Sequence, residues 1–137
     1  MEIRDFWKAT LRQDAASMRR FFAPGARVFW HNTNEAFSAE EFIEVNCEYP
    51  GAWDGEVERV ERIGGLIVTA LRVFAAGGGP SFHVVSFFRV QDGTIVSIDE
   101  YWGDDGAAAG RKILPAGGRV FSRITLSFSA SGSRARP

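Results

Sequence analysis

At 137 residues, the chain is long enough for one domain with its own hydrophobic core. Hydrophobic residues make up 45% and charged residues 24%, the balance of a soluble globular protein. A single cysteine, Cys47, excludes an internal disulfide and a multi-cysteine metal site, and no apolar run approaches the roughly 18 residues of a membrane span. The polar residues Met1–Asp5 predict no signal peptide. We therefore expect a cytoplasmic protein without a membrane contact.

Charge is distributed unevenly along the chain. Residues 1–106 hold ten basic and seventeen acidic residues, a net charge of −7, whereas residues 107–137 hold six basic residues and no acidic residue. An acidic body argues against nucleic-acid binding by the domain. The Ala, Gly, Ser and Arg of residues 107–137 predict a basic tail that is disordered or forms one extra strand. The folded domain is therefore expected at residues 1–106.

Three helices are expected in the first fifty residues. The spacing of apolar residues from Ile3 to Leu11 predicts an amphipathic helix. A second, short helix is expected from Asp14 to Phe22, with Pro24-Gly25 ending it. A capping box from Ser38 to Glu41 predicts the start of a third helix, which Pro50 ends.

Five strands are expected, at Arg27–His31, Glu56–Ile63, Leu66–Ala75, Phe82–Val90 and Ile95–Trp102. Short glycine-rich turns join the last four, which predicts an antiparallel meander. Phe82–Val90 is apolar on both faces, so both faces should be covered. The three helices can cover only one of them, and we therefore expect a partner subunit to cover the other.

Two carboxylates, Asp99 and Glu100, stand side by side in the last expected strand. Neighbouring side chains on a strand point to opposite faces, so only one of the two can enter a pocket. Glu100 should share a face with Ile98 and Trp102, whereas Asp99 should share the other face with Ile95. Apolar flanks make a charged carboxylate costly unless a partner stabilises it, which is also how many catalytic bases are built.

We therefore expect Glu100 to be a general base, with its pKa shifted toward the working pH. Two alternatives stay open. In the first, Glu100 is only a structural partner of His83 or of an arginine. In the second, a bulge before Tyr101 reverses the two faces, and Asp99 is the carboxylate that enters the pocket.

Further polar residues are expected around the same pocket. Tyr49 and Asn46 share a face of the third helix, where they are either donors to an oxyanion or partners of backbone groups at the helix end. The only histidines, His31 and His83, are either pocket groups or structural hydrogen-bonding residues. Both could hold a metal only if they faced Glu100 together, and we expect no metal. The candidate catalytic residues are Glu100, His83, Tyr49 and Asn46, and the candidate ligand-binding residues are Trp7, Trp30, His31, Trp53, Asp99 and Trp102.

Four segments carry a resemblance to a known family, namely Trp30–Glu35, Tyr49–Trp53, Phe82–Phe87 and Asp99–Asp104. In the order and spacing of these segments, residues 2–106 resemble the SnoaL-like branch of the nuclear transport factor 2 superfamily. The resemblance implies an α+β fold, a cone in which three N-terminal helices pack on the concave face of a curved, mostly antiparallel sheet. It also implies a pocket at the wide end of the cone and homodimers through the convex face of the sheet.

The resemblance alone does not fix a function. The superfamily includes ketosteroid isomerases, polyketide cyclases, dehydratases, epoxide hydrolases and many domains of no known activity. We expect a small apolar carbonyl compound as ligand and isomerase, cyclase or dehydratase chemistry that needs no cofactor. The alternatives are a non-catalytic ligand-binding domain and a pure dimerisation module. Residues 107–137 depart from the family pattern.

Overall fold

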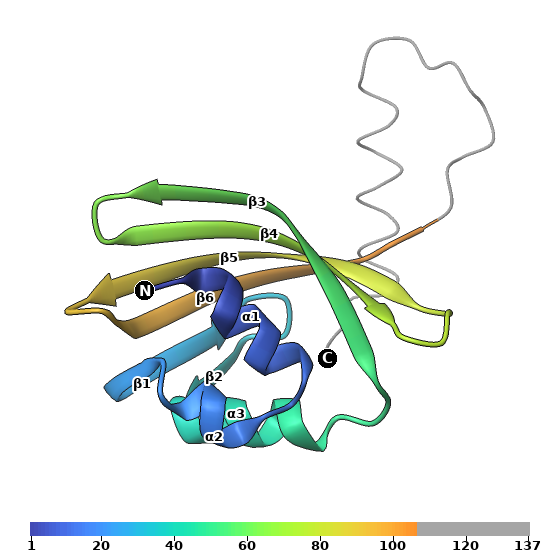
Figure 1. Ribbon diagram of the computed structural model, residues 1–137, viewed down its shortest axis with the longest axis horizontal. Coiled ribbons are helices and arrows are strands. Elements are labelled where there is room, and N and C mark those ends of the chain that lie inside the picture. The colour runs from blue at the N-terminus through green and yellow to red at the C-terminus, as the bar shows by residue number, and fades with distance from the viewer. Residues whose placement is uncertain (107–137) are drawn as a thin grey trace, which may run out of the picture.

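The computed structural model describes residues 1–106, which form three helices and six strands (Figure 1). The helices are α1 (Ile3–Leu11), α2 (Ala15–Arg19) and α3 (Ala39–Glu48). The strands are β1 (Phe22–Trp30), β2 (Glu35–Ser38), β3 (Trp53–Ile63), β4 (Leu66–Ala75), β5 (Ser81–Gln91) and β6 (Thr94–Asp104). The predicted basic tail, residues 107–137, lies outside the described residues.

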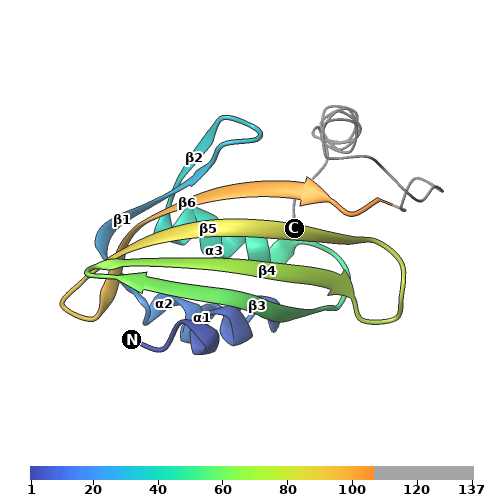
Figure 2. The same cartoon turned by 90° about the horizontal axis from the view of Figure 1, so that it is seen from above.

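The six strands form one curved sheet in the order β2-β1-β6-β5-β4-β3. All neighbouring pairs are antiparallel except β1 and β6, which run parallel. The three helices lie on one side of this sheet, and the sheet does not close into a barrel (Figures 1 and 2). The predicted α+β fold, with three helices against one face of a curved and mostly antiparallel sheet, is confirmed.

Local sequence sets the helix starts as predicted. The carboxylate of Asp14 accepts a hydrogen bond from the backbone N–H of Ser17 and caps α2. At α3, the Ser38 hydroxyl accepts from the N–H of Glu41, and the Glu41 carboxylate accepts from the N–H of Ser38, so the capping box is complete. Within residues 1–106, no helix combines the length and the apolar character that a membrane crossing requires.

The chain between α2 and α3 differs from the prediction. Helix α2 ends at Arg19, and Phe22 begins β1 instead, pairing with Ile95 of β6. Pro24 lies inside β1, where the register with β6 shifts between Phe22 and Arg27. Proline is tolerated in a strand at such an irregularity because no ladder hydrogen bond is required there. Strand β2 was not predicted, since four residues are too few for a clear alternation.

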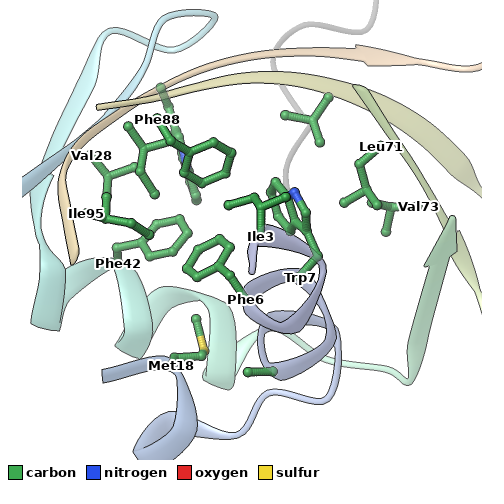
Figure 3. Close-up of a cluster of buried hydrophobic side chains, with 14 of the residues drawn as sticks. Ile3, Phe6, Trp7, Met18, Val28, Phe42, Leu71, Val73, Phe88 and Ile95 are labelled. Atoms are coloured by element: carbon green, nitrogen blue, oxygen red, sulfur yellow. The ribbon is translucent and has the colours of Figure 1, made fainter. Parts of the chain in front are cut away.

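One apolar core fills the space between the helices and the concave face of the sheet (Figure 3). Phe6 of α1 is completely buried and makes edge-to-face contacts with rings from α1, from the segment before β1, from β1 and from β5. The opposite, outer face of β5 and β6 keeps Val85, Phe87 and Tyr101 exposed to 39%, 37% and 47%. The partner subunit predicted to cover that face therefore stays a prediction.

The central position of Phe6 predicts a large loss of stability in Phe6→Ala. Removing a buried phenyl ring leaves a cavity that costs about 3–5 kcal/mol of unfolding free energy. Urea unfolding followed by circular dichroism measures this loss. Phe74→Ala on the outer face is the matched control and should cost clearly less, because Phe74 is only partly buried beside Arg72. Equal losses in the two variants would contradict the central role of Phe6.

Candidate functional site

Glu100 of β6 lies on the concave face of the sheet and is only 1% exposed. Both of its carboxylate oxygens accept hydrogen bonds. The indole Nε1 of Trp30 donates to Oε1 at 2.9 Å, and the hydroxyl of Ser86 donates to Oε2 at 3.0 Å. Trp30 is itself 5% exposed, so this carboxylate and its donors are enclosed by the protein.

These groups belong to one row of side chains that crosses the sheet. Thr69 of β4 pairs with Ser86 of β5, Ser86 pairs with Glu100, and Glu100 pairs with Trp30 of β1. The indole of Trp7 on α1 donates to the Thr69 hydroxyl at 3.1 Å. A buried polar row therefore runs across the apolar core and is attached to the first helix.

A bulge in β6 changes part of the predicted alternation. The register between β5 and β6 shifts just before Ser97, which makes Val96 the extra residue. Ile95 is therefore completely buried on the concave side, and the prediction that it shares a face with Asp99 is wrong. From Ser97 onward the strand alternates regularly, so Glu100 points inward and Asp99 outward.

A small cavity of about 30 Å³ adjoins Glu100 between the helices and the sheet, with room for about two water molecules. Most of its wall is apolar or aromatic. Six candidate residues from the sequence meet there, which are Trp7, Asn46, Tyr49, Trp53, Glu100 and Trp102. The other lining residues are Thr10, Leu11, Gln13, Phe42, Leu71 and Val73.

Amide groups form the polar end of this cavity. Asn46 donates one N–H to the carbonyl of Phe42 at 2.9 Å, which partly fits the alternative in which it serves a backbone group. The Gln13 amide donates to the carbonyls of Asn46 and Tyr49, both at 2.8 Å, and so ties the turn after α1 to the end of α3. Gln13 has a left-handed backbone, with φ of 56°.

Sequence reasoning missed Gln13, Ser86 and Thr69. Gln13 gave no signal, because it is a polar residue in a short polar link between two helices. Ser86 and Thr69 gave a weak one, since each is an isolated hydroxyl in an apolar strand. Buried hydroxyls need partners, which is a reason to search for a polar group opposite them.

His31 and Asp99 lie on the outer face and do not line the cavity. The Nε2 atom of His31 lies 2.7 Å from Oδ1 of Asp99, and both side chains are 41% exposed. The His31 ring also stacks on Tyr101, with ring centroids 4.6 Å apart. The expected ligand-binding role of His31 and Asp99 next to Glu100 is therefore not supported by their position.

His83 also lies on the outer face, which corrects the expectation of a donor beside Glu100. Ser86 faces Glu100, and a residue three positions away on the same strand faces the opposite side. The His83 ring contacts Asp105 Oδ1 at 2.5 Å through Nδ1 and Glu58 Oε1 at 3.1 Å through Nε2. Among residues 1–106, no group of three potential ligands is placed to hold a metal ion.

The two carboxylates determine the charge of His83. Partial burial by itself would lower the pKa of the imidazole, but the hydrogen bonds that the ring donates to Asp105 and Glu58 outweigh it and hold the pKa above its ordinary value of 6.5. Because the ring is 42% exposed, solvent weakens both contacts. The two contacts of His83 therefore link β5 to β3 and to the residue after β6, and they are strongest when the imidazole is protonated.

The chain belongs to the SnoaL-like domain family, whose model matches residues 3–98. This match confirms the resemblance found in the sequence. Comparison with curated proteins finds no significant match.

Solved structures with the same fold are distant in sequence. A candidate ketosteroid isomerase from Kribbella flavida is 18% identical, with a TM-score of 0.70 over 84% of this chain and 88% of that one. A protein of unknown function from Burkholderia xenovorans, similar to nuclear transport factor 2, is 19% identical, with a TM-score of 0.69 over 82% and 92%. A candidate SnoaL-like polyketide cyclase from Shewanella putrefaciens is 11% identical, with a TM-score of 0.60 over 71% and 74%. At these identities the likeness establishes the fold alone.

The His83 cluster predicts a specific pH dependence of stability. A folded pKa above the unfolded value means that the cluster stabilises the fold below about pH 6.5 and that this contribution is lost as the pH rises through the raised pKa. The free energy of unfolding of His83→Gln should therefore fall below that of the unchanged chain at about pH 5.5 and approach it at about pH 9. An NMR titration of the His83 ring with a pKa below 6.5 would contradict the sign.

Proposed function

We propose that this SnoaL-like protein binds a small apolar molecule with a carbonyl group and acts on it as an isomerase, cyclase or dehydratase, with Glu100 as general base and no organic cofactor. The observation that carries the proposal is a carboxylate, 1% exposed, held by two donors at the wall of a cavity lined mostly by apolar and aromatic residues. The fold shared with a candidate ketosteroid isomerase and a candidate polyketide cyclase supports it.

In this proposal Glu100 removes a proton from the carbon next to the carbonyl. Burial works against a charged carboxylate, whereas the hydrogen bonds from Trp30 and Ser86 work in its favour. The two donors also fix the direction of the carboxylate, so both are positioning residues.

The negative charge that develops on the substrate oxygen needs donors on the other side of the cavity. Asn46 uses one of its two amide N–H groups on the Phe42 carbonyl and has the second for a ligand. The phenol of Tyr49 lines the same cavity and is the other candidate donor. A proton held by Glu100 can then return to a different carbon, which completes an isomerisation without any cofactor.

A cavity of about 30 Å³ is too small for such a substrate, so binding in this proposal requires side chains to move. Tyr49 and Trp53 are suited to this movement. Both are only partly buried, their rings lie 5.7 Å apart, and both flank the Pro50-Gly51 turn after α3. Gly51 has φ of 97°, a conformation that favours glycine and marks a sharp change in chain direction.

A non-catalytic ligand-binding domain is the second candidate function. The small cavity favours it, because a carboxylate satisfied by Trp30 and Ser86 also suits a permanently closed core. Glu100 is a general base in the first candidate function and only a structural residue in the second. Substitution of Glu100 therefore distinguishes the two functions.

We also propose that two copies of the chain associate through the outer face of the sheet. The exposed Val85, Phe87 and Tyr101 lie on the neighbouring strands β5 and β6, where an apolar face is costly to leave in water. The homodimers that the family resemblance implies use the same face.

Catalysis by Glu100 predicts that Glu100→Gln loses turnover. The amide keeps the shape of the side chain but cannot accept the substrate proton, and general-base catalysis typically contributes about 10²–10⁴-fold to the rate. The measurement is NMR of deuterium incorporation next to the carbonyl across a panel of cyclic enones and ketones in D₂O.

Asp99→Asn is the matched control for Glu100→Gln. It makes the same chemical change one residue away on the outer face and should leave the exchange rate unchanged. If Glu100→Gln retained the full exchange rate on a substrate that the unchanged chain accepts, the catalytic proposal would fail. The non-catalytic function would then be favoured.

Association through the sheet predicts that Val85→Lys is monomeric. Val85 pairs with Ala70 and Tyr101 on the neighbouring strands, so a lysine there would be buried in the interface without a carboxylate directly opposite it. Light scattering after gel filtration should give twice the chain mass of 15.1 kDa for the unchanged protein and 15.1 kDa for the variant. Ile63→Lys, at an exposed position near the β3–β4 turn, should remain dimeric. An unchanged chain that is monomeric at micromolar concentration would refute the proposal.

A further inference from the structure

A second hollow lies between α1 and β3. It measures about 370 Å³, far more than the cavity beside Glu100. The two hollows share four apolar wall residues, which are Trp7, Leu11, Trp53 and Leu71. The remaining lining of this groove is formed by Arg4, Lys8, Arg12, Asp54, Gly55 and Val57.

The charge of the groove is opposite to that of the domain. Residues 1–106 carry a net charge of −7, with ten basic and seventeen acidic residues. Three of those ten basic residues line the groove, namely Arg4, Lys8 and Arg12, whereas Asp54 is the single acidic residue among its lining residues. A groove with a net positive charge on an acidic domain attracts anions, because the rest of the charge of residues 1–106 repels them.

Ion pairs do not hold these three cations in place. Within residues 1–106, Arg4, Lys8 and Arg12 form no ion pair shorter than 4.0 Å, although Arg12 acts electrostatically on the carboxylate of Asp14 from a longer distance. Their spacing of four residues stacks them on one face of α1, where like charges repel. Lys8 and Arg12 suit the C-terminal half of a helix, but Arg4 lies in the first turn, where the helix dipole disfavours a cation. The helix dipole therefore accounts for Lys8 and Arg12 but not for Arg4.

We propose that this groove binds the anionic head group, a carboxylate or a phosphate, of an amphipathic small molecule. In this proposal the head group lies against the cations Arg4, Lys8 and Arg12. The apolar part of the molecule lies on the wall that Trp7 and Leu11 form. The row from Arg4 to Arg12 is about 12 Å long at 1.5 Å per residue, so one head group can contact two of the three cations at once. That the bound molecule is also the substrate of Glu100 rests on the proposed function, whereas the anion site does not.

Titration calorimetry at low salt tests the site with four probes of equal chain length, used below their micelle concentrations. Decanoate and decyl phosphate carry the two head groups, 1-decanol is neutral and decyltrimethylammonium is cationic. The anions should bind and the cation should not, and added salt should weaken the binding. A difference between decanoate and decyl phosphate identifies the preferred head group. Equal affinities for decanoate and 1-decanol would overturn the proposal.

Charge variants locate the binding. Lys8→Gln should weaken decanoate binding about threefold, and the triple variant Arg4→Gln, Lys8→Gln, Arg12→Gln about tenfold or more, since exposed ion pairs each contribute a few-fold. Arg59→Gln removes an exposed cation of β3 that pairs with Glu61 and should leave the affinity unchanged. Circular dichroism verifies that each variant is folded. Unchanged affinity in the folded triple variant would refute the site.

Two further measurements separate this proposal from its rivals. Glu100→Gln should bind decanoate as the unchanged chain does, so loss of turnover and loss of anion binding are independent results. If no ketone or enone is turned over but the triple variant loses decanoate, the anion site stands and the catalytic proposal fails. Binding to phosphatidylglycerol vesicles without any binding of monomeric decanoate would overturn the proposal in favour of a membrane surface.

Discussion

Two hydrogen bonds hold a buried carboxylate in the middle of the sheet and link the strand that carries it to both of its neighbours. A carboxylate enclosed in an apolar core costs several kcal/mol unless donors compensate it. The donors to Glu100 come from Ser86 on β5 and Trp30 on β1, the two strands that flank β6. The parallel pairing of β1 with β6 and the antiparallel pairing of β5 with β6 are therefore stabilised by the same side chain.

Helix α1 connects this row to the surface of the protein. Its residue Trp7 packs on Phe6 and Phe88 in the core (Figure 3). The indole of Trp7 also donates to Thr69, the end of the row. The same indole forms part of the wall of both hollows, and the cation Lys8 is the next residue along the chain. One short helix therefore closes the core, lines the cavity and presents the positive charge of the groove.

The sequence was sufficient for the fold class and for placing Asp99 and Glu100 on opposite faces of a strand, but not for the whole site. The period of two is local, so it separates the two carboxylates without knowledge of the fold, but it left open which of them faces the pocket. The buried hydrogen bonds from Trp30 and Ser86 identify Glu100 as the inward carboxylate. The face of His83 was not predictable in this way, since β5 is apolar on both faces and its direction follows only from the pairing of Ser86 with Glu100. Strand β1 includes Pro24 because it pairs with β6 on both sides of this residue. The sequence around Pro24-Gly25 indicates only a turn, since the pairing partner lies far away in the chain.

The unequal sizes of the two hollows bear on how a ligand would reach Glu100. The cavity beside the carboxylate has room for about two water molecules, whereas the groove measures about 370 Å³. The wall that the two hollows share is formed by Trp7, Leu11, Trp53 and Leu71. Of these four wall residues, Trp53 is only partly buried, and it lies at the start of β3 beside a left-handed glycine. Trp7 is held by a buried hydrogen bond to Thr69, whereas Trp53 donates to the Pro50 carbonyl at the surface, so rotation of Trp53 breaks no buried hydrogen bond. A ligand with its head group on the row of cations and its carbonyl at Glu100 would therefore enter past Trp53.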